Sequence, residues 1–280
     1  MAVSTAAADT LHPARAPGSD FYYASLYHRP ALRETLRAAA ALRAELLAIP
    51  ASCSDRGVAH VKLAWWHDEL ARADGSAPRH VLTQALQPLF AREPAWRETC
   101  LGLVERLNDA LSATERGDED ALRAWFDALH GDFAQRLARL ATPRLALADA
   151  TVRAIAVDTE LLRAVLELRA QRQAGPLPFD HATLARHGLS AGQVRDARRT
   201  TALGALVSDT LTTRRDRLVA AIAALPRHQR RHARLAVTGA RLVLRATALT
   251  LADGAAVLER RVEATPVDKL FIAWRTRYVG

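Results

Sequence analysis

The sequence predicts an all-α protein whose 280 residues fold as one helical domain. Apolar residues recur at helical spacing in one segment after another, and no stretch shows sustained alternation of apolar and polar residues. Gly and Pro stand mainly between these segments, where they separate helices. Half of the residues are hydrophobic, and a chain of this length can bury one large core.

Capping signals support the helices in the first part of the chain. Ser19 and Asp20 are typical of a helix start, and Pro30 suits the first turn of the next helix. We expect Pro50 to end that helix, and Ser54 or Asp55 to cap the one that follows. The helices predicted up to the middle of the chain cover residues 21–26, 30–49, 58–70, 80–90, 95–111 and 121–140.

The second half shows similar signals. The acidic run at 118–120 suits a helix N-terminus, and Asp180 is expected to cap a short helix that Gly188 ends. Ser190 and Gln193 have the spacing of a capping box. The helices predicted here cover residues 148–172, 181–187, 191–224 and 228–252, followed by a short pair from Gly254 to Arg275.

The formal net charge of +9 comes almost entirely from arginine, since Lys62 and Lys269 are the only lysines. This charge allows attraction to phosphates, diphosphates or an anionic membrane surface. The basic run at 227–234 lacks interleaved aromatic residues, and the chain has no helix-turn-helix or zinc signature, so we expect no nucleic-acid partner. Contact with anionic lipid headgroups is the use that best suits this run.

Several features bear on the cellular compartment. The first dozen residues do not form a secretory signal, no run of about 18 apolar residues predicts a membrane span, and residues 1–18 are expected to be a flexible arm. Cys53 and Cys100 are isolated and are expected to be free thiols. We therefore expect a cytoplasmic protein, either soluble or peripheral to a membrane.

Four motifs in order resemble those of the squalene/phytoene synthase family. Residues 19–24 (SDFYYA) are similar to its opening Ser-x-Phe-Tyr-x-Ala, and residues 62–70 (KLAWWHDEL) to its Arg-Leu-x-Trp-Trp-Arg-x-Glu-Leu, which is the most specific match. Residues 126–133 (FDALHGDF) and 176–190 (PLPFD followed by LARHGLS) resemble two later segments. The likeness covers residues 19 to about 200, and looser helical similarity continues to the end.

The resemblance implies an isoprenoid-synthase-like helical bundle around a central cavity, formed by residues 19–280. In active members, two aspartate-rich helices face each other and hold Mg²⁺ ions that bridge the diphosphates of two prenyl substrates. Such ions neutralise the charge that develops on a leaving diphosphate, and hard oxygen ligands hold them.

This sequence departs from the family where the aspartates belong. Their positions map near Leu47, Ala48, Ala51, Ala164 and Leu168, whereas the family's arginine matches Arg163. We therefore expect neither a Mg²⁺ site nor any other cofactor, and no catalysis. The pattern is similar to a divergent branch that includes assembly factors for respiratory complex I, so the expected partner is an isoprenoid or lipid ligand, or a protein in membrane-complex assembly.

Pocket candidates follow from the same mapping. Trp65, Trp66 and Trp274 are more typical of a core than of a surface that binds a ligand, although Trp65 is also one of the pocket candidates. The candidates are Phe21, Tyr22, Tyr23, Arg43, Leu47, Trp65, Asp158, Leu161 and Arg163.

Two alternatives stay open. One is an active prenyl-diphosphate condensing transferase whose Mg²⁺ ligands are displaced, with Asp158, Glu160 and Glu167 as the fallback metal ligands and Glu45 and Asp55 as further candidates. A simpler reading makes Asp55 a helix cap and Glu45 and Glu167 helix-surface charges, while Asp158 and Glu160, two apart, point to different helix faces. The other alternative is a basic helical module on anionic membranes.

Overall fold

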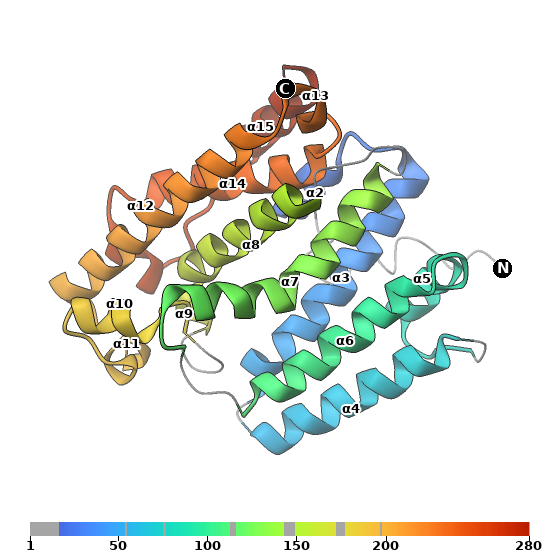
Figure 1. Cartoon of the computed structure of the whole chain (residues 1–280), viewed down its shortest axis with the longest axis horizontal. Coiled ribbons are helices and arrows are strands. Elements are labelled where there is room, and N and C mark those ends of the chain that lie inside the picture. The colour runs from blue at the N-terminus through green and yellow to red at the C-terminus, as the bar shows by residue number, and fades with distance from the viewer. Residues whose placement is uncertain are drawn as a thin grey trace.

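The computed structural model describes residues 17–53, 55–74, 77–112, 116–142, 149–171, 177–196 and 198–279. These residues form helices without any strand, which confirms the all-α fold (Figure 1). Most of the predicted 1–18 arm lies outside the described residues. The helices are α2 (Asp20–Ser25), α3 (Pro30–Ser52), α4 (Arg56–Arg72), α5 (Val81–Arg92), α6 (Ala95–Ala110), α7 (Glu119–Ala141), α8 (Asp149–Leu166), α9 (Leu168–Gln171), α10 (His181–Arg186), α11 (Ala191–Asp196), α12 (Thr201–Ala224), α13 (Arg227–Arg230), α14 (Arg234–Thr250), the 3₁₀ turn η1 (Gly254–Leu258) and α15 (Pro266–Tyr278).

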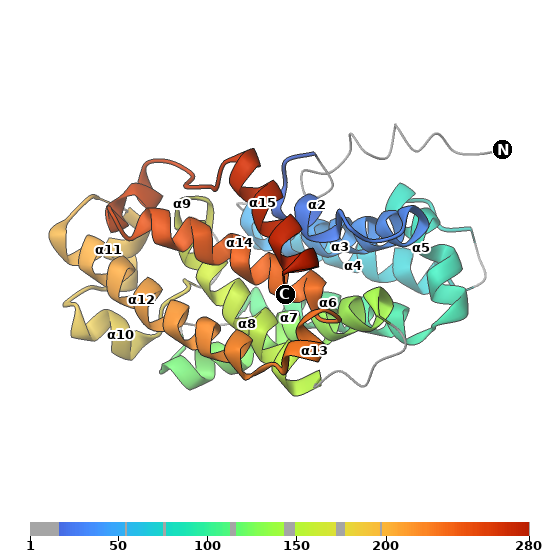
Figure 2. The same ribbon diagram turned by 90° about the horizontal axis from the view of Figure 1, so that it is seen from above.

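Helix α8 occupies the middle of the molecule. It packs against α7, α12 and α14, while α3, α4, α5 and α6 pack together beyond α7 (Figure 1). Seen from above, the molecule is elongated, with α12 and α14 toward one end and α5 toward the other (Figure 2). Helix α15 lies along α14 and contacts α2. The central helices α3, α7 and α8 are therefore the ones that can present side chains to one another in the interior.

The core consists of two large apolar clusters and a small one. The N-terminal cluster joins α3 to α7 and includes Leu42, Leu63 and Trp96. The C-terminal cluster surrounds α8, α12 and α14 and includes Leu162 and Leu211. A small cluster lies between α7 and α8. Each fully buried Leu contributes about 1.5–3 kcal/mol, so these clusters dominate the stability of the fold.

Local capping signals are confirmed at several helix starts. The Ser19 hydroxyl accepts from the Tyr22 N–H at 3.1 Å, and the Asp55 carboxylate accepts from the Gly57 N–H at 2.6 Å. Asp118 and Asp180 cap α7 and α10 in the same way, and Gly188 has the positive φ of 64° that suits a helix end. Ser190 and Gln193 form the predicted capping box, with reciprocal bonds of 2.7 and 3.3 Å.

Helix ends differ from the prediction at Pro50 and at Thr200. Pro50 does not end its helix: α3 continues to Ser52, whose hydroxyl donates to the Ile49 carbonyl and closes the last turn. The predicted helix 191–224 is two helices, because the Thr200 hydroxyl caps a new start by accepting from the Leu203 N–H at 3.2 Å.

Two more predicted helices are divided. The helix predicted at 228–252 is divided into α13 and α14, and the Arg230 side chain at the end of α13 donates to the Leu225 carbonyl at 2.9 Å. The helix predicted at 148–172 breaks at Glu167, between α8 and α9, and both of its predicted ends lie outside the described residues.

Tryptophan burial corrects another expectation. Trp66 lies in the core, but Trp65 and Trp274 keep 40% and 44% of their surface exposed.

Both cysteines are free thiols, as predicted, and burial raises the pKa of Cys100 to about 12. In the part of the chain that the structure describes, no helix combines the length and apolar character that crossing a bilayer requires.

Candidate functional site

Helices α3, α7 and α8 bring four polar side chains together in the interior, and we call these the central charge network: Arg43, His130, Glu160 and Arg163. Glu160 accepts from Arg43 at 3.4 Å and from Arg163 at 3.1 Å. A guanidinium nitrogen of Arg43 also lies within hydrogen-bond distance of the His130 Nδ1 atom. The network therefore joins α3 to α7 and α8 through residues that are far apart in the sequence.

Electrostatics fixes the protonation states in this network. Burial disfavours the Glu160 carboxylate, but the charges of Arg163 and Arg43 outweigh burial and lower its pKa to about 2. Burial and the neighbouring Arg43 lower the pKa of His130 to about 3, so the imidazole is neutral near pH 7. Within these four residues two guanidinium groups therefore face one carboxylate. The charge of Glu160, followed by those of Asp20 and Glu167, raises the pKa of Arg163.

The fallback metal carboxylates do not converge. Asp158 is almost fully buried and pairs with Arg123 of α7, with one of the two bonds at 3.2 Å. Glu160 faces Arg43 instead, and Glu167 is half-buried in the turn after α8. Among the residues described, no three or more His, Cys, Asp or Glu side chains gather as a metal site. This arrangement does not fit a divalent ion held between α3 and α8.

The positions mapped for the family aspartates are placed in different environments. On α3, Leu47 packs against the N-terminal core, while Ala48 and Ala51 are exposed. On α8 and α9, Ala164 lies in the small cluster and Leu168 in the C-terminal core.

The remaining pocket candidates are dispersed. Phe21 packs against the N-terminal core, and Tyr22 stacks under the Arg37 guanidinium, 4.5 Å from the ring centre, with its edge to Tyr23. Leu161 is fully buried in the small cluster. Trp65 on α4 contacts Trp66 of the same helix and His80 at the start of α5. Figure 1 places α4 at the edge of the molecule, apart from α8.

Glu69, in the Trp-Trp motif, has a structural role that its sequence did not reveal. Its carboxylate is fully buried and accepts from the Arg79 and His80 N–H groups at 2.7 Å and from the Thr83 hydroxyl at 2.6 Å. Burial opposes its charge, but these hydrogen bonds lower its pKa overall. The motif therefore fixes the start of α5 against α4.

The sequence reading also missed His130 and Lys269. Lys269 is buried on α15 and bonds to Asp20 at 2.9 Å, to Glu263 at 3.0 Å and to the Gly18 carbonyl at 3.0 Å, which ties α15 to the start of α2. His130 stands within one of the family-like segments, and that position was the only signal it gave. The sequence signal for Lys269 was weaker still: it is one of only two lysines in the chain.

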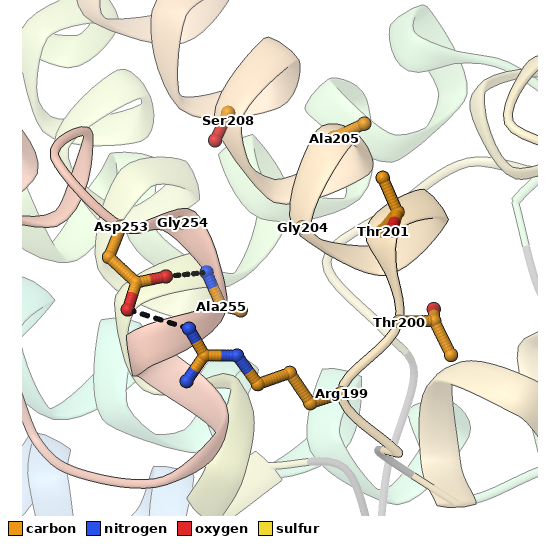
Figure 3. A pocket seen from close by; sticks show the side chains of 9 residues that line it. All are labelled: Arg199, Thr200, Thr201, Gly204, Ala205, Ser208, Asp253, Gly254 and Ala255. Carbon is orange, nitrogen blue, oxygen red and sulfur yellow. Dashed lines mark hydrogen bonds and ion pairs between the residues drawn. The ribbon is translucent and has the colours of Figure 1, made fainter.

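A pocket of about 580 Å³ lies on the surface between the start of α12 and η1 (Figure 3). At its edge, Arg199 is held by Asp253 at 2.9 Å and by Glu259 at 2.8 Å. It contains none of the residues predicted for the site. The lining residues are Arg199, Thr200, Thr201, Gly204, Ala205, Ser208, Asp253, Gly254 and Ala255.

Comparison with known proteins decides the family. The family model described as Squalene/phytoene synthase matches residues 14–268. The chain belongs to the squalene/phytoene synthase family. The resemblance seen in its motifs is thereby confirmed.

Solved structures of the squalene/phytoene synthase family share the fold at low identity. The chain is similar to squalene synthase HpnC from Alicyclobacillus acidocaldarius, at 18% identity and a TM-score of 0.60, covering 83% of this chain and 89% of that one. It is similar to a dehydrosqualene synthase in complex with ligand, at 13% identity and a TM-score of 0.71, covering 93% and 91%. TcSQS, in complex with E5700, gives 12% identity and a TM-score of 0.58, covering 92% and 82%. No curated protein matches the chain.

Proposed function

We propose that this family member binds an isoprenoid or a similar lipid without condensing prenyl diphosphates. The observation that carries the proposal is the central charge network. Where the family resemblance leads us to expect facing carboxylates on two helices, α3 and α8 present Arg43 and Arg163 around a single Glu160.

The chemistry of diphosphate departure supports the loss of catalysis. Ionisation of a prenyl diphosphate leaves charge on the leaving group, and metal ions held by several carboxylates neutralise it. Here the Glu160 charge is already balanced by two guanidinium groups, and Asp158 is balanced by Arg123. Because both carboxylates are already paired with guanidinium groups, neither is available to neutralise a metal ion.

The same arginines favour direct contact with an anionic headgroup. Arg43 and Arg163 keep 17% and 29% of their side-chain surface accessible, so a ligand can reach them. Guanidinium groups bind phosphate oxygens in pairs of parallel hydrogen bonds. A lipid phosphate or diphosphate could therefore bind here without metal, with its chain directed along the apolar surfaces of α3 and α8.

The test combines turnover and binding. Purified protein is incubated with Mg²⁺ or Mn²⁺ and farnesyl or geranylgeranyl diphosphate, and both released diphosphate and extracted hydrocarbons are measured. We expect no turnover. In thermal-shift measurements, farnesyl phosphate should stabilise the protein more than farnesol does.

Variants locate the headgroup contact. Arg43→Met should remove most of the difference between farnesyl phosphate and farnesol, while Arg215→Met, on the exposed side of α12, should leave it unchanged. Metal-dependent formation of a squalene- or phytoene-like product would overturn the proposal and return attention to Asp158, Glu160 and Glu167 as ligands. No turnover and no lipid effect would refute lipid binding and favour a scaffold whose protein partner is sought by pull-down.

A further inference from the structure

Helix α15 turns its most apolar side outward. The exposed residues Val267, Leu270, Phe271, Trp274 and Tyr278 recur at helical spacing, so they form one continuous side, which we call the aromatic stripe. Their exposed fractions range from 44% to 77%. The opposite side of the helix, which packs inward, carries the buried residues Lys269, Ala273 and Thr276. A surface helix of a soluble protein normally shows the reverse pattern.

The rings of the stripe lie against one another. Phe271 stacks on Trp274 with 6.0 Å between ring centres, and Trp274 is 6.0 Å from Tyr278. The exposed apolar surface is therefore contiguous. Contiguous apolar surface of this kind marks an interaction site more often than scattered exposed residues do.

Arg275 and Arg277 flank the stripe on α15, and Arg241, Arg234 and Arg230 lie near these two or near one another; we call the five the arginine cluster. Burial lowers the pKa of Arg241, and so do the nearby charges of Arg275 and Arg230. Burial and the nearby charge of Arg277 lower the pKa of Arg234. These guanidinium groups are therefore close enough to repel one another.

The partners of these arginines are neutral groups. Arg241 donates to the Thr276 hydroxyl at 2.9 Å, and Arg234 to the His28 Nε2 atom at 3.2 Å. Arg277 lies over the Tyr278 ring, 5.3 Å from its centre. Across the described ranges, none of the five forms a salt bridge with a carboxylate. Within the described part of the chain, no carboxylate therefore pairs with the positive charge of this cluster.

We propose that the aromatic stripe and the arginine cluster form a docking surface for an anionic phospholipid bilayer. Aromatic rings and aliphatic side chains of such a helix enter the headgroup boundary, while arginines contact lipid phosphates. A second copy of the chain suits this surface less well, because a two-fold interface would bring two arginine clusters together. This inference goes beyond lipid binding in the interior, since it uses a different surface.

Vesicle co-sedimentation tests the proposal. The probes are vesicles of phosphatidylcholine alone and of phosphatidylcholine with about one third phosphatidylglycerol, at low and at high salt. We expect binding to the anionic vesicles, weakened by salt. Trp274→Ser should reduce the partition coefficient about tenfold, because one large ring is lost from the membrane contact.

Trp65→Ser is the matched control, since Trp65 has nearly the same exposure but lies on α4, which packs on α3 and α6. Circular dichroism melting checks that both variants fold. Equal loss in the two variants, or no binding of the unaltered protein to anionic vesicles, would overturn the proposal. Sedimentation that shows a dimer, converted to monomer by Trp274→Ser without any vesicle binding, would assign the surface to self-association instead.

Discussion

At the scale of single residues, Glu69 concentrates three hydrogen-bond donors on one buried carboxylate oxygen. In Glu69→Ala the two N–H groups at the start of α5 and the Thr83 hydroxyl lose this partner. Hydrogen bonds to a charged group contribute about 1.5–3 kcal/mol each, but they share one acceptor here, so we expect a loss of about 3 kcal/mol in the free energy of unfolding. Urea denaturation measures it.

The control for Glu69 is its neighbour Asp68, whose side chain is largely exposed and lies 3.9 Å from His67. Asp68→Ala should change the free energy of unfolding by less than about 0.5 kcal/mol. Equal effects of the two substitutions would contradict the capping role of Glu69.

His130 and His28 predict a pH dependence of stability. Burial, with nearby arginines, lowers their pKa values to about 3 and about 4, against 6.5 for an ordinary histidine. At a pH between the lowered pKa of the folded state and 6.5, the unfolded chain binds more protons than the folded chain. The free energy of unfolding is therefore highest above pH 6.5 and decreases as the pH falls toward 4. Each histidine contributes a slope of up to about 1.4 kcal/mol per pH unit.

Glu160 extends this acid sensitivity to lower pH. Its lowered pKa of about 2 means that its contribution is present above about pH 4.5 and disappears as the pH falls toward 2. Unfolding free energies measured between pH 7 and 5 exclude the contribution of Glu160, and report the histidines together with Glu167, whose pKa burial raises. His130→Gln keeps an acceptor for Arg43 and should reduce the slope in that range; an unchanged slope would mean that His130 does not contribute.

At the scale of the helices, Arg214 joins four segments of the chain. It is almost fully buried on α12, pairs with Glu119 of α7 at 2.9 Å, and donates to the carbonyls of Leu161 and Pro178 at 3.2 and 2.9 Å. Removing one partner of a buried pair costs about 3–5 kcal/mol, so Arg214→Met should destabilise the protein by that amount. Arg215→Met, one residue away on the exposed side, should change the denaturation midpoint little.

Gly254 lets η1 approach α12. A Cβ atom there would lie 2.3 Å from the Ser208 hydroxyl and 3.0 Å from the Gly204 carbonyl. Gly254→Ala should therefore cost about 1–3 kcal/mol through overpacking. Thermal melting should show partial recovery in the Gly254→Ala, Ser208→Gly double variant, since the nearer contact is removed. Gly239→Ala on α14, with open space around it, should not destabilise the protein.

Helices could be predicted where the signals are local. The caps at Asp55 and Asp180 and the box at Ser190 act within a few residues, so their pattern is legible in the sequence. Pro50 misled the prediction because a proline in the last turn leaves the following residues able to complete it. The start of α12 was missed because its cap is a single threonine, Thr200, and neither Gly nor Pro stands between it and the helix before.

At the scale of the whole molecule, four ordered motifs predicted the family, but they did not predict the central charge network. Arg43 and Glu160 are 117 residues apart, and no local pattern pairs them. The same holds for the outward side of α15, because only packing shows that Trp274 faces away from the core. Charge alone suggested a membrane at residues 227–234, whereas the structure adds the apolar surface beside it.

The two free cysteines differ in how accessible their thiols are to a labelling reagent. Cys100 is sealed among the helices of the N-terminal cluster, while Cys53 lies half-buried just after α3. A maleimide should therefore label one thiol quickly, and the second only as fast as the N-terminal half opens. Following that second reaction by mass spectrometry would time the opening of one half of the protein without any introduced probe.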